Sequence, residues 1–242
     1  MDAVQIDNDL KPDTKLYRYV KIETFMSFVE AKRIHLTNVN LWDDKWEVIL
    51  SKIPTVDNEG RPNPPLYSFY QYIYGQCWSL VQESDAMWRI YSPSRTGVQI
   101  SSSVEKFKFI GGVNRSYLGK VVYFETVSDL LEKASSRNSP FDEALFKRIA
   151  FEHEREVRFL THGDFLDQFE PKWTHVSLPV DPSIFIESIT IDPRADDWYI
   201  DTITRYCERI GLAVTPVKSS LYESDPHLKL GLVKKWVKVK DK

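Results

Sequence analysis

Two glutamates separated by a single residue, Glu154 and Glu156, are the side chains in this sequence best suited to chemistry. On an extended backbone, residues two apart project to the same side at a spacing of about 7 Å. Two carboxylates placed in this way repel each other unless they have partners. Arg155 and Arg158 could be those partners, which would make the group a structural ion-pair cluster. The alternative is a carboxylate pair at the mouth of an active site.

A second acidic group, made of Asp43, Asp44 and Glu47, lies in a polar and aromatic loop expected over 38–47. Its carboxylate oxygens could hold a divalent cation. A turn in which Asp43 or Asp44 forms an Asx cap is the simpler interpretation. The five histidines have no spacing typical of a metal site, so no metal is expected.

Aromatic side chains cluster around Ser79 and in the short helix that follows it in the sequence. Trp78 and Ser79 are neighbours in a predicted strand, so they point to opposite faces. Met87 and Tyr91 share one face of the helix, and Trp88 lies beside them. These side chains either fill the core or form the wall of a pocket that offers π-faces to a flat heterocycle.

The elements that must position these residues follow from hydrophobic periodicity and turn residues. Strands are expected over 16–20, 34–37, 76–81, 97–101, 121–124, 154–160, 175–179, 185–191 and 212–217. Helices are expected over 22–33, 85–91, 127–134, 141–151 and 195–211. The mixture has no regular β-α-β alternation, so it predicts an α+β fold of mixed, mostly antiparallel sheets packed with helices.

The chain of 242 residues is long enough for one sizeable domain, which we place at 15–226 between a flexible N-terminus (1–14) and a basic tail (227–242). A net charge of −3 leaves no electrostatic footprint for duplex nucleic acid. Cys77 and Cys207 are far apart and are expected to be reduced, with Cys77 inert in a buried strand. A polar N-terminus and the lack of an apolar run of membrane-spanning length predict a soluble, cytoplasmic protein.

Several short motifs occur in a fixed order: the run 16–19, the loop 40–47, the stretch from Ser79 through Trp88 and Tyr91 to Gly97, and Lys147 followed by 154–158. In this order they resemble the bacterial and phage domain-of-unknown-function family 2971, which includes AbiGi-like abortive-infection proteins. The resemblance spans roughly residues 16–220. The loop of that family usually reads Asn-Asp-Pro-Phe-Glu, whereas this chain keeps an acid and Glu47 but lacks the proline. The resemblance implies a phage-defence or toxin effector and supplies no reaction.

A more distant similarity, to ADP-ribosyltransferases, implies a reaction. Those enzymes carry an Arg or His, a Ser or Tyr, and a catalytic Glu in chain order, and here Arg18, Ser79 and Glu156 follow that order. The similarity implies a split-sheet fold and NAD as substrate. It gives Glu156 the stabilisation of an oxocarbenium-like ribose, Glu154 the activation of an acceptor, and Ser79 the support of the ribose. Arg18 would hold the pyrophosphate, with Tyr17 beside it, and Trp88 or Tyr91 would stack on nicotinamide.

Three functions remain open from the sequence. The first is an NAD-consuming ADP-ribosyltransferase or NAD glycohydrolase with an unknown acceptor. The second is a metal-dependent nuclease or phosphodiesterase that uses Asp43, Asp44, Glu47, Glu154 and Glu156. The third is a non-catalytic module whose aromatic cleft binds a nucleotide, a peptide or a single strand. The first requires Arg18, Ser79 and Glu156 to converge on one cleft.

Overall fold

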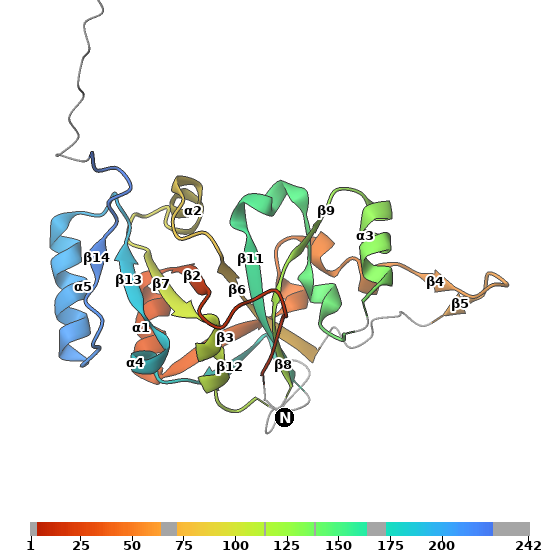
Figure 1. The fold of residues 1–242 in the computed structure, drawn as a ribbon, viewed down its shortest axis with the longest axis horizontal. Helices are drawn as coiled ribbons and strands as arrows, with labels where there is room; N and C mark the ends of the chain where they lie inside the picture. Colours follow the sequence, from red (N-terminus) through yellow and green to blue (C-terminus); the bar gives the residue numbers. More distant parts are fainter. Residues whose placement is uncertain (1–3, 64–71, 114, 138, 164–172, 225–242) are drawn as a thin grey trace, which may run out of the picture.

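A mixed, mostly antiparallel sheet of ten strands runs through the structure, a computed structural model that describes residues 4–63, 72–113, 115–137, 139–163 and 173–224 (Figure 1). The strand order is β1-β8-β11-β6-β2-β7-β13-β14, and β3, which pairs with β12, branches from β6. The strands of this sheet are β1 (Val4–Ile6), β2 (Lys15–Val20), β3 (Arg33–Asn38), β6 (Ile73–Ser79), β7 (Val98–Ser103), β8 (Ser116–Lys120), β11 (Glu156–His162), β12 (His175–Pro179), β13 (Ser188–Ile191) and β14 (Val217–Lys218).

Two small sheets and several helices surround this sheet. The small sheets pair β4 (Thr55–Val56) with β5 (Pro62–Asn63), a hairpin that projects from one end of the molecule in Figure 1, and β9 (Val122–Phe124) with β10 (Phe146–Arg148). The α-helices are α1 (Ile22–Ala31), α2 (Asp85–Tyr91), α3 (Val127–Ser135), α4 (Pro182–Phe185) and α5 (Asp197–Arg209). The architecture confirms the predicted α+β class. Within the described part of the chain, no helix has the length and apolar character needed to cross a bilayer.

Strands β6 and β11 form the centre of the sheet and separate two environments. They are antiparallel partners along their whole length. On one face, Trp78 packs edge to face against Phe107 and Phe185 at ring-centroid distances of 5.3 and 5.8 Å, in the main apolar core. On the other face, Arg158 lies opposite Cys77 in the strand register. Because side chains alternate along a strand, Ser79 and Glu156 point to that second face together with Cys77 and Arg158.

The sheet forks at β6. On the side away from β11, this strand pairs with β3 only near its N-terminal end and with β2 only at Ser79. Residues 76–78 therefore have no strand partner on that side among the described residues, and their backbone groups must find other partners. The gap between the diverging strands β2 and β3 is where a cavity forms.

The segment 141–160 differs from the sequence prediction of a helix over 141–151 and a strand over 154–160. It contains a 3₁₀ helix at Asp142–Leu145, β10, a second 3₁₀ helix at Ile149–Glu154, and β11. In β10, Phe146 packs in an apolar cluster with Phe124 and Leu130, while its neighbour Lys147 contacts buried carboxylates. A strand sends neighbouring side chains to opposite sides and a helix does not, so tertiary packing overrides the helical pattern here.

Four predictions concern segments towards the chain ends. The last strand, expected over 212–217, is reduced to β14, because Pro216 has no N–H for a sheet hydrogen bond. The predicted helix over 195–211 is present as the slightly shorter α5. In the N-terminal stretch expected to be flexible, β1 pairs with β8 and Leu10 is buried. The basic tail 227–242 lies outside the described residues.

Glu143 is a buried carboxyl group whose ionisation should weaken the fold. It is 2% exposed, Oε1 accepts a hydrogen bond from the Ser51 backbone N–H, and Oε2 has no partner among the described residues. Burial raises its pKa from 4.5 to about 8. A carboxyl group with a raised folded-state pKa stabilises the native state at low pH, and that stability is lost as the pH rises through the interval between the two values.

We therefore expect Glu143→Gln to be nearly neutral at about pH 5 and to stabilise the fold by on the order of 3 kcal/mol at about pH 8.5. Urea denaturation at the two pH values measures the difference. An effect that does not change with pH would contradict the assignment of a buried, ionisable carboxyl group.

Candidate functional site

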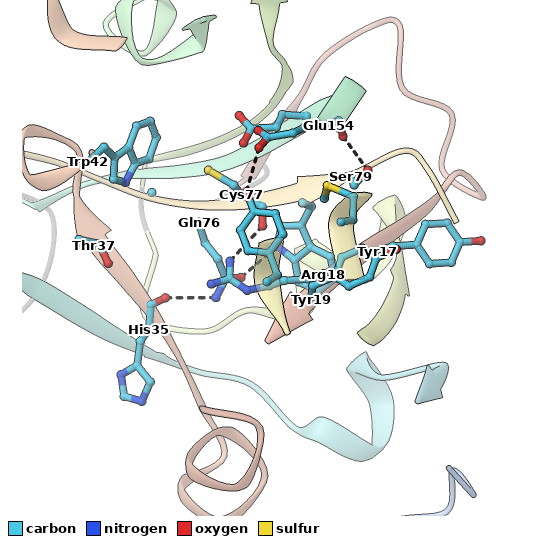
Figure 2. A pocket seen from close by; sticks show the side chains of 15 residues that line it. Tyr17, Arg18, Tyr19, His35, Thr37, Trp42, Gln76, Cys77, Ser79 and Glu154 are labelled. Atoms are coloured by element: carbon cyan, nitrogen blue, oxygen red, sulfur yellow. Dashed lines mark hydrogen bonds between the residues drawn. The ribbon is translucent and has the colours of Figure 1, made fainter. Parts of the chain in front are cut away.

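A pocket of about 240 Å³ occupies the fork between β2, β3 and β6 (Figure 2). Residues singled out from the sequence line it: Tyr17, Arg18, Ser79, Tyr91, Glu154 and Glu156. The guanidinium, hydroxyl and carboxylate that the sequence assigned to one cleft thus come from separate segments to the same cavity. Cys77 also lines the pocket, and burial raises the pKa of its thiol to about 12, so it is protonated at neutral pH.

Arg18 supplies the positive charge of this pocket. Its Nη1 donates a hydrogen bond of 3.0 Å to the Cys77 carbonyl oxygen, a backbone group that the fork leaves without a strand partner. A guanidinium has five N–H donors, and within the described chain Arg18 makes this one hydrogen bond and no ion pair. The ring of Tyr17, its neighbour, extends away from the guanidinium (Figure 2).

Burial has the largest influence on the pKa of Arg18 and lowers it to about 10, although nearby groups that include Glu156 act in the opposite direction. The side chain therefore carries its charge at neutral pH without full compensation. A partly desolvated cation with unused donors beside a cavity is suited to bind an anion.

Glu156 supplies a permanent negative charge. Its Oε1 accepts a hydrogen bond from Lys147 Nζ at 2.9 Å, and its Oε2 accepts two from Arg158, at 3.0 Å from Nε and 2.7 Å from Nη2. Burial alone would raise the pKa of Glu156, but Arg158 and Lys147 outweigh it and lower the pKa to about 2. The carboxylate is therefore ionised at all physiological pH values.

Lys147 is the centre of a buried charge cluster that we define as Glu47, Lys147, Glu154, Glu156 and Arg158. Its Nζ also pairs with Glu154, and it lies 3.4 Å from Glu47 Oε1. Arg158 Nη2 lies 3.0 Å from Glu47 Oε2. Three carboxylates thus share this space with two cations, so the cluster has an excess of one negative charge. This excess adjoins the pocket that holds the uncompensated Arg18.

The two glutamates reach the same lysine although the backbone between them is not extended. Glu154 ends a 3₁₀ helix, and Arg155 has a left-handed conformation with φ 43° and ψ 56° before β11 begins. This conformation is uncommon for residues other than glycine and is typical of functional sites. The predicted strand geometry at Glu154 was wrong, while the proximity of the two carboxylates is observed. Their partners are Lys147 and Arg158, and the Arg155 side chain is exposed.

Ser79 holds this junction in place and does not offer a free hydroxyl to the pocket. Its side chain is almost fully buried, and Oγ donates a hydrogen bond of 2.7 Å to the Glu154 carbonyl oxygen. On the other side of the junction, the Glu156 backbone N–H donates to the Tyr123 hydroxyl at 2.9 Å. Ser79 therefore positions the glutamates, in place of the ribose contact expected from the sequence.

Trp88 does not reach the pocket, in contrast to its predicted stacking role. Its ring is fully buried, lies edge to face with Tyr19 at 4.7 Å, and donates from Nε1 to Glu83 at 2.8 Å. Its helix neighbour Met87 lines the pocket, and neighbouring helix residues point about 100° apart, so Trp88 is directed away from the pocket. Tyr91 is partly exposed, and its hydroxyl donates to Glu154 Oε1 at 3.0 Å. Tyr91 is thus the aromatic side chain of α2 that a ligand can contact.

Trp42, Glu47 and Lys147 belong to the ordered motifs, but no role in a nucleotide site was expected for them. The Trp42 ring lies 4.5 Å from the Arg158 guanidinium and lines the pocket. It packs so closely on β6 that a Cβ at Gly75 would lie 2.7 Å from the ring. A glycine inside a buried strand was the available signal for this close approach.

The acidic side chains of the loop 38–47 are held by basic side chains of the protein. Asp44 caps the 3₁₀ helix that follows it and forms a two-bond ion pair with Arg148, which confirms the Asx interpretation. Glu47 turns into the charge cluster, where Lys147 and Arg158 neutralise the carboxylates that a metal would need. Among the residues that the structure describes, no group of three or more His, Cys, Asp or Glu side chains could hold a metal ion.

Comparisons with known proteins show what this chain resembles. No curated protein matches the sequence. Among solved structures, the chain is similar to Thermus sp. 2.9 DarT in complex with NAD+, with 12% identity, a TM-score of 0.40, and coverage of 86% of this chain and 96% of that chain. It is also similar to the same protein in complex with ADP-ribosylated ssDNA, with 10% identity, a TM-score of 0.39, and coverage of 86% and 94%. Residues 87–159, which include Lys147, Glu154, Glu156 and Arg158, match the model of a family described as "Protein of unknown function (DUF2971)", which confirms the resemblance over this stretch.

Proposed function

We propose that this protein binds NAD in the pocket at the fork and cleaves the bond between nicotinamide and ribose, as an ADP-ribosyltransferase or NAD glycohydrolase. The observation that carries the proposal is that a positive and a negative side chain line the same cavity. Arg18 has unused donors for a phosphate group, and Glu156 is a carboxylate that stays ionised. NAD needs both, because it presents a pyrophosphate near a ribose that becomes cationic when nicotinamide leaves.

The charge cluster supports the chemical step. When the C1′–N bond breaks, nicotinamide leaves as a neutral molecule with the bonding electrons, and positive charge develops on the ribose. Lys147 and Arg158 fix the Glu156 carboxylate, so it does not have to reorient to stabilise that charge. Tyr91 offers an aromatic face at the pocket wall for the nicotinamide ring.

The space around the pocket is also suited to a dinucleotide. A second cavity of about 170 Å³ continues behind Arg18 and is lined mainly by apolar side chains that include Phe25, Phe28 and Ile34. Arg18 lines both cavities, so a phosphate group at this guanidinium would have a ring site on either side. The resemblance of the ordered motifs to a family that includes abortive-infection proteins supports a role as a phage-defence or toxin effector, which we place in the cytoplasm.

Incubation of the protein with NAD, with nicotinamide release followed by chromatography, tests the proposal. We expect release by the wild-type chain and much slower release by the Arg18→Gln variant. Calorimetry on the same samples separates the alternatives. Tight NAD binding without release would favour a nucleotide-binding module, and neither binding nor release would refute the proposal.

A further inference from the structure

A larger, more open groove of about 650 Å³ is lined by the same glutamates. It shares Trp42, Cys77, Tyr91, Glu154 and Glu156 with the pocket at the fork. A ligand in the pocket and a ligand in the groove would therefore meet at these carboxylates. A group-transfer reaction needs this arrangement, because donor and acceptor must approach one carbon from different directions.

The rim of the groove is apolar and exposed. Leu41, which ends a 3₁₀ helix, is 51% exposed, and Ile90 on α2 is 54% exposed. Phe151 also lines the groove, and its ring lies 4.8 Å from Lys147 Nζ. Large apolar side chains gathered at a concave surface are typical of a contact surface for another molecule.

The charge of the groove selects among possible partners. Five carboxylates line it against two cations, Lys147 and Arg148. Arg148 is already paired with Asp44, and Asp43 has no ion-pair partner within the described chain. Nucleic acid binds where Lys and Arg neutralise its phosphates, so a groove with excess negative charge disfavours a polyanion and attracts a cationic partner.

We infer that the groove binds a polypeptide segment in which apolar side chains flank a basic one, and that this segment carries the acceptor. The inference rests on the proposed function and adds the class of the acceptor. A hydroxyl or guanidinium group of the segment attacks C1′ of the ribose as the bond to nicotinamide breaks. Its proton passes to the Glu154 carboxylate, which lines both cavities, and from there to solvent.

Binding to short fluorescent probes tests the acceptor class without any turnover. The probes are a Leu-Arg-Ser repeat peptide, the matching Leu-Glu-Ser peptide, and a single-stranded oligonucleotide of similar length. By fluorescence anisotropy we expect the Leu-Arg-Ser peptide to bind at least about tenfold more tightly than the other two, a difference of about 1.4 kcal/mol. Equal or tighter binding of the oligonucleotide would overturn the inference.

A pair of double variants locates the binding surface. Leu41→Arg with Ile90→Arg removes the apolar rim and reduces the net negative charge of the groove, so it should weaken binding of the Leu-Arg-Ser peptide at least about tenfold. The control, Leu131→Arg with Ile184→Arg, alters two apolar side chains that are each 49% exposed on other helices and should not change binding. Equal loss in both double variants, or none in the first, would overturn the inference.

A transfer assay distinguishes this inference from the proposed function. Radiolabel from the ADP-ribose part of NAD should appear on the Leu-Arg-Ser peptide, while nicotinamide release is measured in the same tube. Release of nicotinamide without labelling of the peptide would refute a polypeptide acceptor but would agree with the proposed function. No release of nicotinamide would refute the proposed function. The binding of the peptide to the groove would then be tested by the anisotropy measurements alone.

Discussion

Replacement of Glu156 by glutamine is expected to slow nicotinamide release from NAD by about 10²- to 10³-fold, the usual effect of removing one electrostatic contact to a transition state. The amide keeps the size of the side chain but loses the charge that the pocket holds beside the ribose. Steady-state release by the purified variant, compared with the wild-type chain at a temperature where both are folded, measures the effect. Turnover equal to that of the wild-type chain would show that Glu156 has no role in the reaction.

The same substitution should also weaken the fold, because Glu156 is the partner of two buried cations. Removing one member of a buried ion pair costs about 3–5 kcal/mol. The lowered pKa of Glu156 gives this effect a pH signature. Its stabilising contribution is present above the unfolded value of 4.5 and is lost as the pH falls towards about 2, so the difference between wild type and variant should shrink over that range.

Glu47→Gln is the matched control for both measurements. Glu47 belongs to the same charge cluster and contacts Lys147 and Arg158, but it lines the groove and not the pocket. Burial raises its pKa despite those two cations, so its contribution to stability is lost as the pH rises, opposite to that of Glu156. Loss of nicotinamide release of equal size in both variants would mean that the cluster acts only through the fold.

The local elements of this fold could be predicted from the sequence because they depend on neighbouring residues. The alternation in β2 and the 3.6-residue period of α5 each predicted the observed element. The convergence of Arg18 and Glu156 on one pocket was also expected, from a resemblance in residue order. What could not be predicted is the reason they meet, because the fork at β6 depends on which strands pair and in which register.

In the charge cluster, the two glutamates were correctly predicted to lie close together, although the local structure predicted for them was wrong. Glu154 and Glu156 were expected to lie together on a strand, and they lie together because Arg155 adopts a left-handed conformation. No role was expected for Lys147 beyond its place among the ordered motifs, because its segment has a helical pattern. Its true position depends on the pairing of β10 with β9, which is far away in the sequence. Sequence patterns report local preference, whereas this cluster is held by contacts between distant segments.

Two arginines near the pocket have opposite roles, and the difference follows from their partners. Arg158 is fully buried, pairs with Glu47 and Glu156, and has a raised pKa. Among the residues that the structure describes, Arg18 makes one hydrogen bond, to a carbonyl oxygen, and its pKa is lowered. The first is therefore bound within the structure, while the second keeps donors that have no acceptor among the described residues and are open to a ligand.

Arg18→Gln should therefore lose substrate affinity without losing stability. Hydrogen bonds to a charged group contribute about 1.5–3 kcal/mol, so we expect KM for NAD to rise about 10- to 100-fold. The free energy of unfolding should stay the same or increase, since the native state no longer contains a partly desolvated cation without an ion-pair partner. Nicotinamide release over a range of NAD concentrations and urea denaturation measure the two effects.

Arg89→Gln provides the control for this experiment. Arg89 lies on α2, its side chain is 62% exposed, and it pairs with Asp85 on the same helix. Its removal takes away one exposed positive charge near the pocket and should change neither KM nor stability by more than a small amount. A rise in KM of the same size in both variants would assign the effect to net charge. A large loss of stability in Arg18→Gln would instead show that Arg18 holds the fork together, since only a structural role for its bond to the Cys77 carbonyl oxygen would make the fold depend on it.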